Sequence, residues 1–294
     1  MCESSITKEM NQPLLHVMIP AYGKSIFLEE TLKAACDNLS SSVLITVIED
    51  PSEENVIEEI VTRFKHRVRY ERNSKRLGIA NNFNKCLELS EGIFTQICGH
   101  DDLITKDPTN ELLRCLNKEN ENTNIIFLAR AKHNSSSFTL RLADLAKIIL
   151  KPRKKTLQHV NSKKFLERLM LGYWFYFPAI LWRTEVARKY KFDEQFRSAM
   201  DLDFLIDMII KKEKFKFVDE NILDYRRHEE SASSLNSSIG NRYQEELKCH
   251  AKVSAYAKSH KFIKLNLYSK LAIGVRANAT LNAILLKSSK NEIS

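Results

Sequence analysis

The sequence predicts an α/β protein with a mostly parallel central sheet flanked by helices, followed by a C-terminal helical extension. Along the first hundred residues, short apolar runs alternate with segments whose apolar residues recur at helical spacing. This order is typical of a parallel sheet with crossover helices. Acidic and turn-forming residues follow the runs at 20–22, 49–50 and 101–102. Parallel strands end at one edge of the sheet, where open α/β sheets bind ligands, so these residues are expected to meet there.

The first expected strand covers residues 14–19, a nearly continuous apolar run that Pro20 closes. Such runs suit a strand that is buried on both faces. A helix is expected at 27–39, because its apolar residues at 28, 32, 35, 36 and 39 fall on one side at helical spacing. The same alternation predicts strands at 43–48, 68–70 and 93–98 and helices at 55–64 and 78–89.

Beyond residue 104 the pattern is less regular. Residues 133–160 combine three consecutive serines, an apolar stretch and the basic run 151–155, and we expect an insertion or a lid. The remaining segments predict strands at 125–129, 179–183, 215–218 and 222–225 and helices at 107–116, 165–170, 184–190 and 202–210.

Two helices are expected in the C-terminal extension, at 242–258 and 263–286. Apolar residues in the second, at 263, 267, 271, 275 and 279, lie close to one helical face, and Lys and Arg occupy much of the remainder. The apolar face would pack on the rest of the protein, or it would contact a membrane, because basic amphipathic helices bind anionic lipid. Both interpretations stay open on the sequence.

The composition is that of an ordinary globular protein, with 43% hydrophobic and 28% charged residues in 294. No apolar run approaches the roughly 18 residues of a membrane span. Residues 1–12 lack the apolar core of a secretory signal, and we expect a cytoplasmic location. Six scattered cysteines without Cys-x-x-Cys spacing indicate reduced thiols.

A net charge of +9 fits a nucleic-acid-binding protein, a protein at an anionic membrane surface or an enzyme with a polyanionic substrate. The chain contains no RNA-binding motif, and the aromatic run 173–177 has no interleaved basic residues. A nucleic-acid partner is therefore not expected. With seven glycines the chain also lacks the glycine-rich first loop of a nucleotidyltransferase.

Asp101 and Asp102 follow the apolar-rich run 93–98 directly after Gly99 and His100. Two adjacent carboxylates repel each other, and hard cations such as Mg²⁺ take one or two carboxylates together with substrate phosphates as ligands. The same two residues would also suit the first turn of a helix. The other polar strand ends favour the ligand site, because they converge on the same edge of the sheet.

The N-terminal hundred residues resemble a family 2 glycosyltransferase of the GT-A fold. The resemblance is carried by Val17-Met18-Ile19-Pro20-Ala21-Tyr22, Ile48-Glu49-Asp50-Pro51-Ser52, Gly78-Ile79-Ala80 with Asn84, and Gly99-His100-Asp101-Asp102. It implies an inverting transfer of a sugar from a nucleotide-diphosphate sugar, most often a UDP-sugar, to a glycan or lipid-linked acceptor. Bacterial surface glycan synthesis is the corresponding biological expectation.

By this resemblance the strand ends bind the nucleotide, and the acids after the second strand contact the base. For several of these residues a structural part is an equal alternative: Asp50 as a turn residue, Arg76 in a solvated loop and Asn84 as an exposed helix position. The expected nucleotide-binding residues are Pro20, Ala21, Tyr22, Glu49, Asp50, Arg76, Gly78, Asn84, His100 and Asp101.

The resemblance also implies Mn²⁺ or Mg²⁺ on the diphosphate, held by Asp101 and by His228. Imidazole suits a transition-metal ion such as Mn²⁺. In a closing segment that matches the family, Arg226, Arg227 and Ser233 are expected near the diphosphate. The chain departs from the family at Gly99, where the first acid of Asp-x-Asp is usual, and weaker metal binding is expected because one carboxylate is lost.

The resemblance continues at Phe192-Asp193-Glu194 and at Asp201, which takes the position of the catalytic base, preceded by Met200 in place of the usual Glu. Asp201 would alternatively cap the helix that follows. Tyr173 and Trp174 are expected at the acceptor, since exposed aromatic rings suit sugar faces.

The expected domains are a catalytic unit at 1–235, with a nucleotide-binding half at about 12–104 and an acceptor half at about 105–235, and the extension at 236–294. The alternative function is a catalytically impaired protein of the same fold that binds a nucleotide or glycan.

Overall fold

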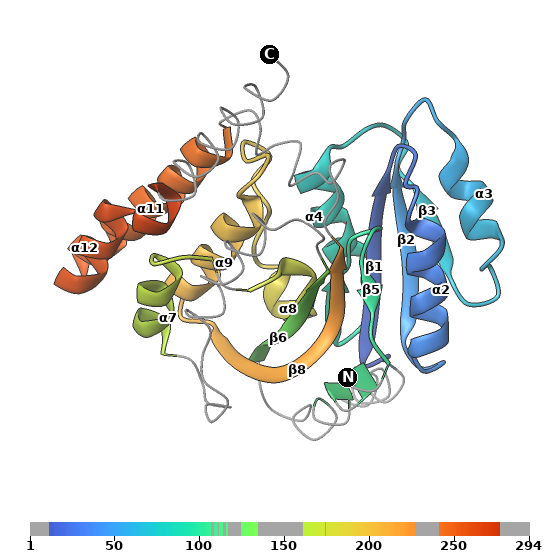
Figure 1. Ribbon diagram of the computed structural model, residues 1–294, viewed down its shortest axis with the longest axis horizontal. Helices are drawn as coiled ribbons and strands as arrows, with labels where there is room; N and C mark the ends of the chain where they lie inside the picture. The colour runs from blue at the N-terminus through green and yellow to red at the C-terminus, as the bar shows by residue number, and fades with distance from the viewer. Residues whose placement is uncertain are drawn as a thin grey trace, which may run out of the picture.

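The computed structural model describes residues 12–106, 109–110, 112–113, 116, 125–134, 161–173, 175–226 and 241–276. In these residues, eight strands form one curled sheet in the order β3-β2-β1-β4-β7-β6-β8-β5, with helices on both faces (Figure 1). In chain order the strands are β1 (Leu15–Tyr22), β2 (Leu44–Asp50), β3 (Arg69–Arg72), β4 (Phe94–Ile97), β5 (Leu103–Ile104), β6 (Ile125–Asn134), β7 (Ile180–Arg183) and β8 (Lys214–Arg226). The α/β class predicted from the sequence is confirmed.

The helices follow the predicted order. They are α2 (Leu28–Asn38), α3 (Val56–Thr62), α4 (Ile79–Leu89), α7 (Ser162–Leu169), the 3-10 turn η1 (Phe177–Ala179), α8 (Thr184–Ala187), α9 (Met200–Ile210), α11 (Asn241–Ser259) and α12 (Ile263–Leu271). The described residues between 109 and 116 are also helical. Residues 135–160, where an insertion or lid is expected, lie outside the described residues.

β1 is buried on both sides, as its apolar run predicts, and its alternate side chains enter two different cores. Val17 and Ile19 pack with α2 and α3 on one face of the sheet. Met18 on the opposite face packs in the core that contains residues of α4, α7 and α9. Successive strand residues point to opposite faces, so one strand serves two layers.

The strands β3, β2, β1 and β4 are parallel, and this half therefore ends at one edge. β7 then runs antiparallel to both β4 and β6, and β8 is parallel to β6. The register of β1 on β2 places Tyr22 opposite Asp50. The polar strand ends of the first half are thus neighbours, as the alternation of elements predicts.

β8 corrects the sequence-based expectation of two short strands at 215–218 and 222–225. It is one strand that continues through the polar residues between them and curls around the sheet (Figure 1). Its pairing with β6 is irregular between Leu128 and Ala131, where Arg130 forms an ion pair with Asp219. The polar side chains in the middle of β8 therefore belong to a continuous strand, in which Asp219 pairs with Arg130 of β6, and they do not mark a turn between two strands.

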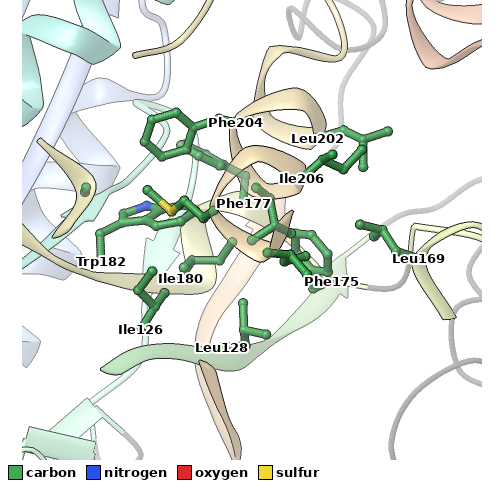
Figure 2. Close-up of a cluster of buried hydrophobic side chains, with 14 of the residues drawn as sticks. Ile126, Leu128, Leu169, Phe175, Phe177, Ile180, Trp182, Leu202, Phe204 and Ile206 are labelled. Atoms are coloured by element: carbon green, nitrogen blue, oxygen red, sulfur yellow. The ribbon is translucent and has the colours of Figure 1, made fainter. Parts of the chain in front are cut away.

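The core on the α9 face is rich in aromatic side chains. Trp182, Phe177 and Phe204 are labelled with their aliphatic neighbours in Figure 2. Phe204 lies edge-on to Trp182 and stacks on Phe192, with ring centroids 5.2 and 3.9 Å apart. Large buried rings dominate core energetics, so this cluster fixes α9 against β7.

The C-terminal helices contribute to the same core. Cys249 and Val253 of α11 and Leu265 of α12 are fully buried in the cluster that includes α9. The predicted domain boundary at 235/236 lies outside the described residues. Within those residues, α11 and α12 lie together at one side of the molecule and α3 lies at the other (Figure 1). No described helix combines the length and apolarity needed to cross a bilayer.

The helix expected at 263–286 is interrupted. α12 ends at Leu271, and Ala272 adopts left-handed backbone with φ of 45°. On the expected apolar face, Ile263, Leu267 and Leu271 are exposed and Val275 is buried, whereas Leu265 and Ser269 are buried on the other side of α12. Of the two expected interpretations, packing on the protein therefore does not hold for the α12 part of this face. Helical periodicity identified a row of apolar residues in this segment. It could not show whether that row packs on the rest of the protein or contacts a membrane.

One carboxylate of α11 holds the segment that leads into α9. Glu245 is buried and accepts hydrogen bonds from the backbone N–H groups of Arg197, Ser198 and Ala199 at 2.7–2.9 Å. A negative charge is favourable there, because N–H groups at a helix start lack helical partners. Lys252 of α11 adds ion pairs of 2.7 Å to Asp203 and Asp207 of α9.

We expect Glu245→Gln to lower the free energy of unfolding by about 1–3 kcal/mol, because an amide NH₂ would face backbone donors in a buried site. Urea denaturation followed by circular dichroism measures the change. Gln244→Ala, at an exposed neighbouring position of α11, is the matched control and should unfold like the parent protein. Equal stability of both variants would contradict the assignment.

Candidate active site

The ends of β1 and β2 form the first part of the candidate site. Tyr22 is 43% exposed, and the guanidinium of Arg76 lies 4.4 Å from its ring centroid. Pro20 and Ala21 are buried within β1, opposite Ile48 and Glu49. An exposed aromatic ring beside a cation therefore stands at the strand end where the sequence predicts a nucleotide.

Asp50 organises the loop that precedes α4. Its carboxylate accepts hydrogen bonds from the backbone N–H groups of Leu77 and Gly78 at 2.7 and 2.8 Å and a longer one from the Asn73 amide at 3.3 Å. Gly78 has φ of 81°, and a Cβ there would meet nothing within 4 Å. Glycine at this position thus allows the positive φ angle, which other residues rarely adopt. The space beside its Cα is open.

Glu49 points to the other side of β2 and is fully buried. Its carboxylate accepts a hydrogen bond from the Tyr70 hydroxyl, and Arg72 lies 3.8 Å away. Burial and the Glu49 carboxylate together raise the pKa of Tyr70 above its usual range. Glu49 thus joins β2 to β3 in this structure.

Two asparagines of α4 are also engaged by the protein. Asn84 donates to the Phe192 carbonyl and accepts from the Phe192 N–H, at 2.9 and 2.8 Å. Asn82 is buried, accepts from Asn73 and donates to the Ile48 carbonyl. Both polar side-chain atoms of Asn84 are hydrogen-bonded to the backbone of Phe192. The role of Asn84 in nucleotide binding stays a prediction.

Gly99 is enclosed by the two carboxylates that follow it. A Cβ at this position would lie 2.5 Å from an oxygen of Asp101 and 2.7 Å from an oxygen of Asp102. Asp102 is 1% exposed and accepts hydrogen bonds from the N–H groups of Gly99 and Arg226. The carboxylates of Asp101 and Asp102 therefore occupy the space that a side chain at position 99 would need.

Burial raises the pKa of the Asp102 carboxyl well above its usual range, and the nearby Asp101 raises it further. The N–H groups of Arg226 and Gly99 lower it in part. Asp101 is only partly buried, so its carboxylate is the accessible member of the pair. The carbonyl of His100 accepts a hydrogen bond of 3.0 Å from Thr31 of α2, which fixes the loop from the other side.

Arg226 ends β8 beside this pair. Its backbone bonds Asp102 at 3.2 Å, while its guanidinium pairs with Glu30 and lies 4.2 Å from the Phe27 ring centroid. The side chain is thus anchored at the start of α2. Arg227, His228 and Ser233, predicted near the metal and diphosphate, lie outside the described residues.

Asp201 occupies the first turn of α9. One of its oxygens accepts a hydrogen bond of 2.8 Å from the Tyr173 hydroxyl, and the other accepts from the Leu202 N–H at 2.8 Å. The structure therefore brings together one residue predicted as the base and one predicted at the acceptor. Trp174 lies outside the described residues.

Burial raises the pKa of Asp201, and the Tyr173 hydroxyl and the Arg242 charge oppose this rise. Arg242 comes from α11 and bonds Glu246 at 2.8 Å. The Tyr173 pKa is itself raised by burial and by Asp201, so its hydroxyl keeps its proton and donates. A carboxylate with a raised pKa is a stronger proton acceptor than an exposed one.

Tyr225 connects the two acidic positions. It precedes Arg226, whose N–H bonds Asp102, and it lies near enough to Tyr173 to raise the pKa of that hydroxyl. Its ring is 4.9 Å from that of Tyr176, centroid to centroid. The end of β8 therefore contacts Asp102 through Arg226 and contributes through Tyr225 to the electrostatic surroundings of Tyr173.

The sequence did not reveal Arg242, Glu245 or Asn82 as parts of this region. Arg242 and Glu245 lie on a helix that looked like a separate extension, and no local motif marks them. Asn82 is a buried amide two positions from the predicted Asn84. Its place on the apolar side of α4, beside Cys86, is the one signal that could have indicated it.

The GT-A expectation of a divalent cation can be tested on the donor set. Within the described part of the chain, no three His, Cys, Asp or Glu side chains converge as a metal site would require. Asp101 and Asp102 nevertheless place two mutually repelling carboxylates at one point. This arrangement fits a hard cation that takes one protein carboxylate, with diphosphate and water oxygens completing its ligands.

Comparisons with known proteins agree with this arrangement. Residues 16–181 match the model of glycosyl transferase family 2. The chain therefore belongs to glycosyl transferase family 2, and the predicted family and transferase class are confirmed. An uncharacterized glycosyltransferase of Methanocaldococcus jannaschii is 21% identical over 224 residues, which cover 74% of this chain and 72% of that protein.

The uncharacterized glycosyltransferase EpsJ of Bacillus subtilis is 21% identical over 76% of this chain and 64% of its own length. Among solved structures, S. aureus TarS 1-349 in complex with UDP-GlcNAc has a TM-score of 0.61 at 15% identity, covering 82% of this chain and 66% of that one. The mannosyltransferase PcManGT of Pyrobaculum calidifontis, in complex with GDP-Man and Mn²⁺, has a TM-score of 0.58 at 14% identity, covering 96% and 81%. The chain thus spans about two thirds of the length of several relatives.

Restoring the family's usual acid at Gly99 is expected to harm this protein. In Gly99→Asp the new side chain would displace Asp101 or the buried Asp102, and overpacking of this kind costs about 1–3 kcal/mol. Urea denaturation measures the loss, and calorimetry with Mn²⁺ measures whether cation affinity rises. Gly23→Asp, at the positive-φ turn after β1, controls for loss of a glycine, although there the backbone itself is strained. A variant as stable as the parent with tighter Mn²⁺ binding would contradict the account.

Proposed function

We propose that the chain is an inverting glycosyltransferase that moves a sugar from a nucleotide-diphosphate sugar to an acceptor hydroxyl, with Asp201 as the general base. The observation that carries this proposal is the Asp201 carboxylate at the start of α9, oriented by Tyr173 and raised in pKa by burial. A base oriented by a second hydrogen bond is the arrangement that proton abstraction requires.

In the proposed step the acceptor oxygen attacks the anomeric carbon while Asp201 takes the hydroxyl proton. The bond from that carbon to the diphosphate oxygen breaks, and the nucleoside diphosphate leaves. Attack from the side opposite the leaving group inverts the anomeric centre. Tyr173 and the Leu202 N–H hold the Asp201 carboxylate throughout, and both of its oxygens keep lone pairs for the incoming proton.

The donor would lie along the edge formed by β1, β2 and β4. Tyr22 with Arg76, the open space at Gly78 and the Asp50 loop support a nucleotide there. A bound Mn²⁺ or Mg²⁺ would stabilise negative charge on the departing diphosphate, and Asp101 would hold it, with His228 as the predicted second ligand. TarS and PcManGT are solved with UDP-GlcNAc and GDP-Man, and we take the donor class from them.

The acceptor side rests on fewer observations. Tyr173 is engaged by Asp201 in this structure, so its proposed part is to orient the base, next to the acceptor hydroxyl. A glycan or lipid-linked acceptor, a surface-glycan pathway and a cytoplasmic location stay predictions from the sequence.

A catalytically impaired nucleotide-binding or glycan-binding protein is the second candidate. Gly99 and Met200 favour it, since both replace acids that the family usually carries. Calorimetry with UDP- and GDP-sugars, combined with a product assay on a panel of acceptors, separates the two. Binding without transfer or hydrolysis would support the second candidate.

Asp201→Asn should keep the fold and donor affinity but lower transfer at least about a hundredfold, because removal of a general base costs roughly 10²–10⁴ in rate. Initial rates of nucleoside diphosphate release and calorimetry with the donor measure the two properties. Asp207→Asn, on the same helix but paired with Lys252, is the control and should remain active. Near-normal turnover of Asp201→Asn would remove the assignment.

Tyr173→Phe should shift the acid limb of the kcat/KM profile to higher pH. The tyrosine hydroxyl lowers the Asp201 pKa, so its removal raises that pKa further above the ordinary carboxyl value. The base is deprotonated only above its pKa, and activity is lost as pH falls through it. Rates between pH 5 and 9 measure the limb, with Tyr176→Phe, a ring outside this hydrogen bond, as control. An unmoved limb would contradict the proposed part of Tyr173.

A further inference from the structure

The net charge of the chain comes entirely from one C-terminal stretch. Residues 247–291 contain nine Lys and Arg residues and no Asp or Glu, and the remainder of the chain holds 37 residues of each sign. Lys258, Lys261, Lys264 and Lys270 of this stretch are exposed around α12. The excess of basic charge is therefore local in the sequence, and four of its lysines lie on or beside α12.

The same helix carries three large apolar side chains that are exposed. Ile263 is 84% exposed, and Leu267 and Leu271 are 51% and 44% exposed. They are four residues apart and share one side of α12, whereas Leu265 and Ser269 are buried on the opposite side. Ile273, 54% exposed, follows α12 after the left-handed residue Ala272. We call these four residues the α12 ridge.

We propose that the α12 ridge docks on an anionic phospholipid membrane. An exposed apolar stripe with lysines at its borders is the pattern of a helix that lies in the membrane interface. Apolar side chains would enter the acyl boundary, and the lysines would meet lipid phosphates. A second copy of the chain is a poorer occupant, because the exposed lysines around the ridge would face those of the other copy and repel them.

The segment that follows the ridge contacts the loop that carries Tyr173. A Cβ at Gly274 would lie 2.6 Å from the Leu171 carbonyl and 3.4 Å from Gly172, so the two backbones are in close contact. The next residue, Tyr173, bonds Asp201. If the proposed function holds, docking brings the base beside the bilayer and the acceptor is lipid-linked. The lipid contact itself does not depend on that function.

The first test is sedimentation of the full chain with vesicles at low salt, without donor. Binding to vesicles of phosphatidylglycerol and phosphatidylcholine is expected, with little binding to phosphatidylcholine alone. Raising the ionic strength from 50 to 500 mM should weaken binding, since salt screens the lysine–phosphate attraction. Absence of binding to anionic vesicles at low salt would overturn the proposal.

The second test changes the ridge. Ile263→Glu with Leu267→Glu should lower the vesicle partition coefficient at least about tenfold, because apolar burial is lost and like charge is added. Val56→Glu, on the exposed start of α3 at the far side of the molecule (Figure 1), is the matched control. Equal binding by the ridge variant and the control would overturn the proposal.

The charge contribution has its own pair of variants. Lys261→Gln with Lys270→Gln should weaken binding about tenfold or more, since each lysine near an anionic surface contributes about 1 kcal/mol. Lys33→Gln with Lys65→Gln, also exposed, should bind like the parent. Thermal melts confirm that these surface variants fold. Concentration-dependent dimers that the ridge variant abolishes, without any vesicle binding, would assign the ridge to a second copy and overturn the proposal.

Discussion

The position of the candidate base depends on a carboxylate from another helix. Glu245 of α11 binds the three backbone N–H groups that lead into α9, and Asp201 follows two residues after the last of them. Lys252 of α11 forms an ion pair with Asp203 of α9, and the charge of Arg242 opposes the rise that burial causes in the pKa of Asp201. A segment that looked like an appendage in the sequence thus helps to position Asp201 and contributes to its electrostatic surroundings.

At the donor edge, most predicted polar side chains are also engaged by the protein itself. Asp50 bonds the loop before α4, Glu49 bonds β3, and Asn84 bonds Phe192. These contacts hold the strand ends and loops in fixed positions, and preorganised positions favour electrostatic catalysis. Tyr22 and Arg76 are exposed at this edge and Asp101 is partly exposed, and the proposed donor chemistry rests on these three residues.

Local patterns predicted the first half of the fold well. Apolar runs gave β1, β2 and β4 to within a few residues, and helical spacing gave α2 and α4, because each buries one defined face. β8 was split in the prediction, since its central polar residues pair with β6 at a bulge that only tertiary structure reveals. A local motif pointed to Asp201, and the structure places it beside Tyr173 at the start of α9, while its role stays a prediction. Arg242 and Glu245 influence residues that lie 40 or more positions away in the sequence. A local sequence pattern cannot reveal contacts over such a separation.

The acid-free stretch around α12 has a colloidal consequence. Without residues 247–291 the chain would carry 37 cations and 37 anions, and a protein without net charge has little repulsion to keep its copies apart. The same cut would open the hydrophobic core at Cys249 and Val253. A shortened protein would therefore lose the net charge that opposes precipitation and would also expose apolar core residues that promote it.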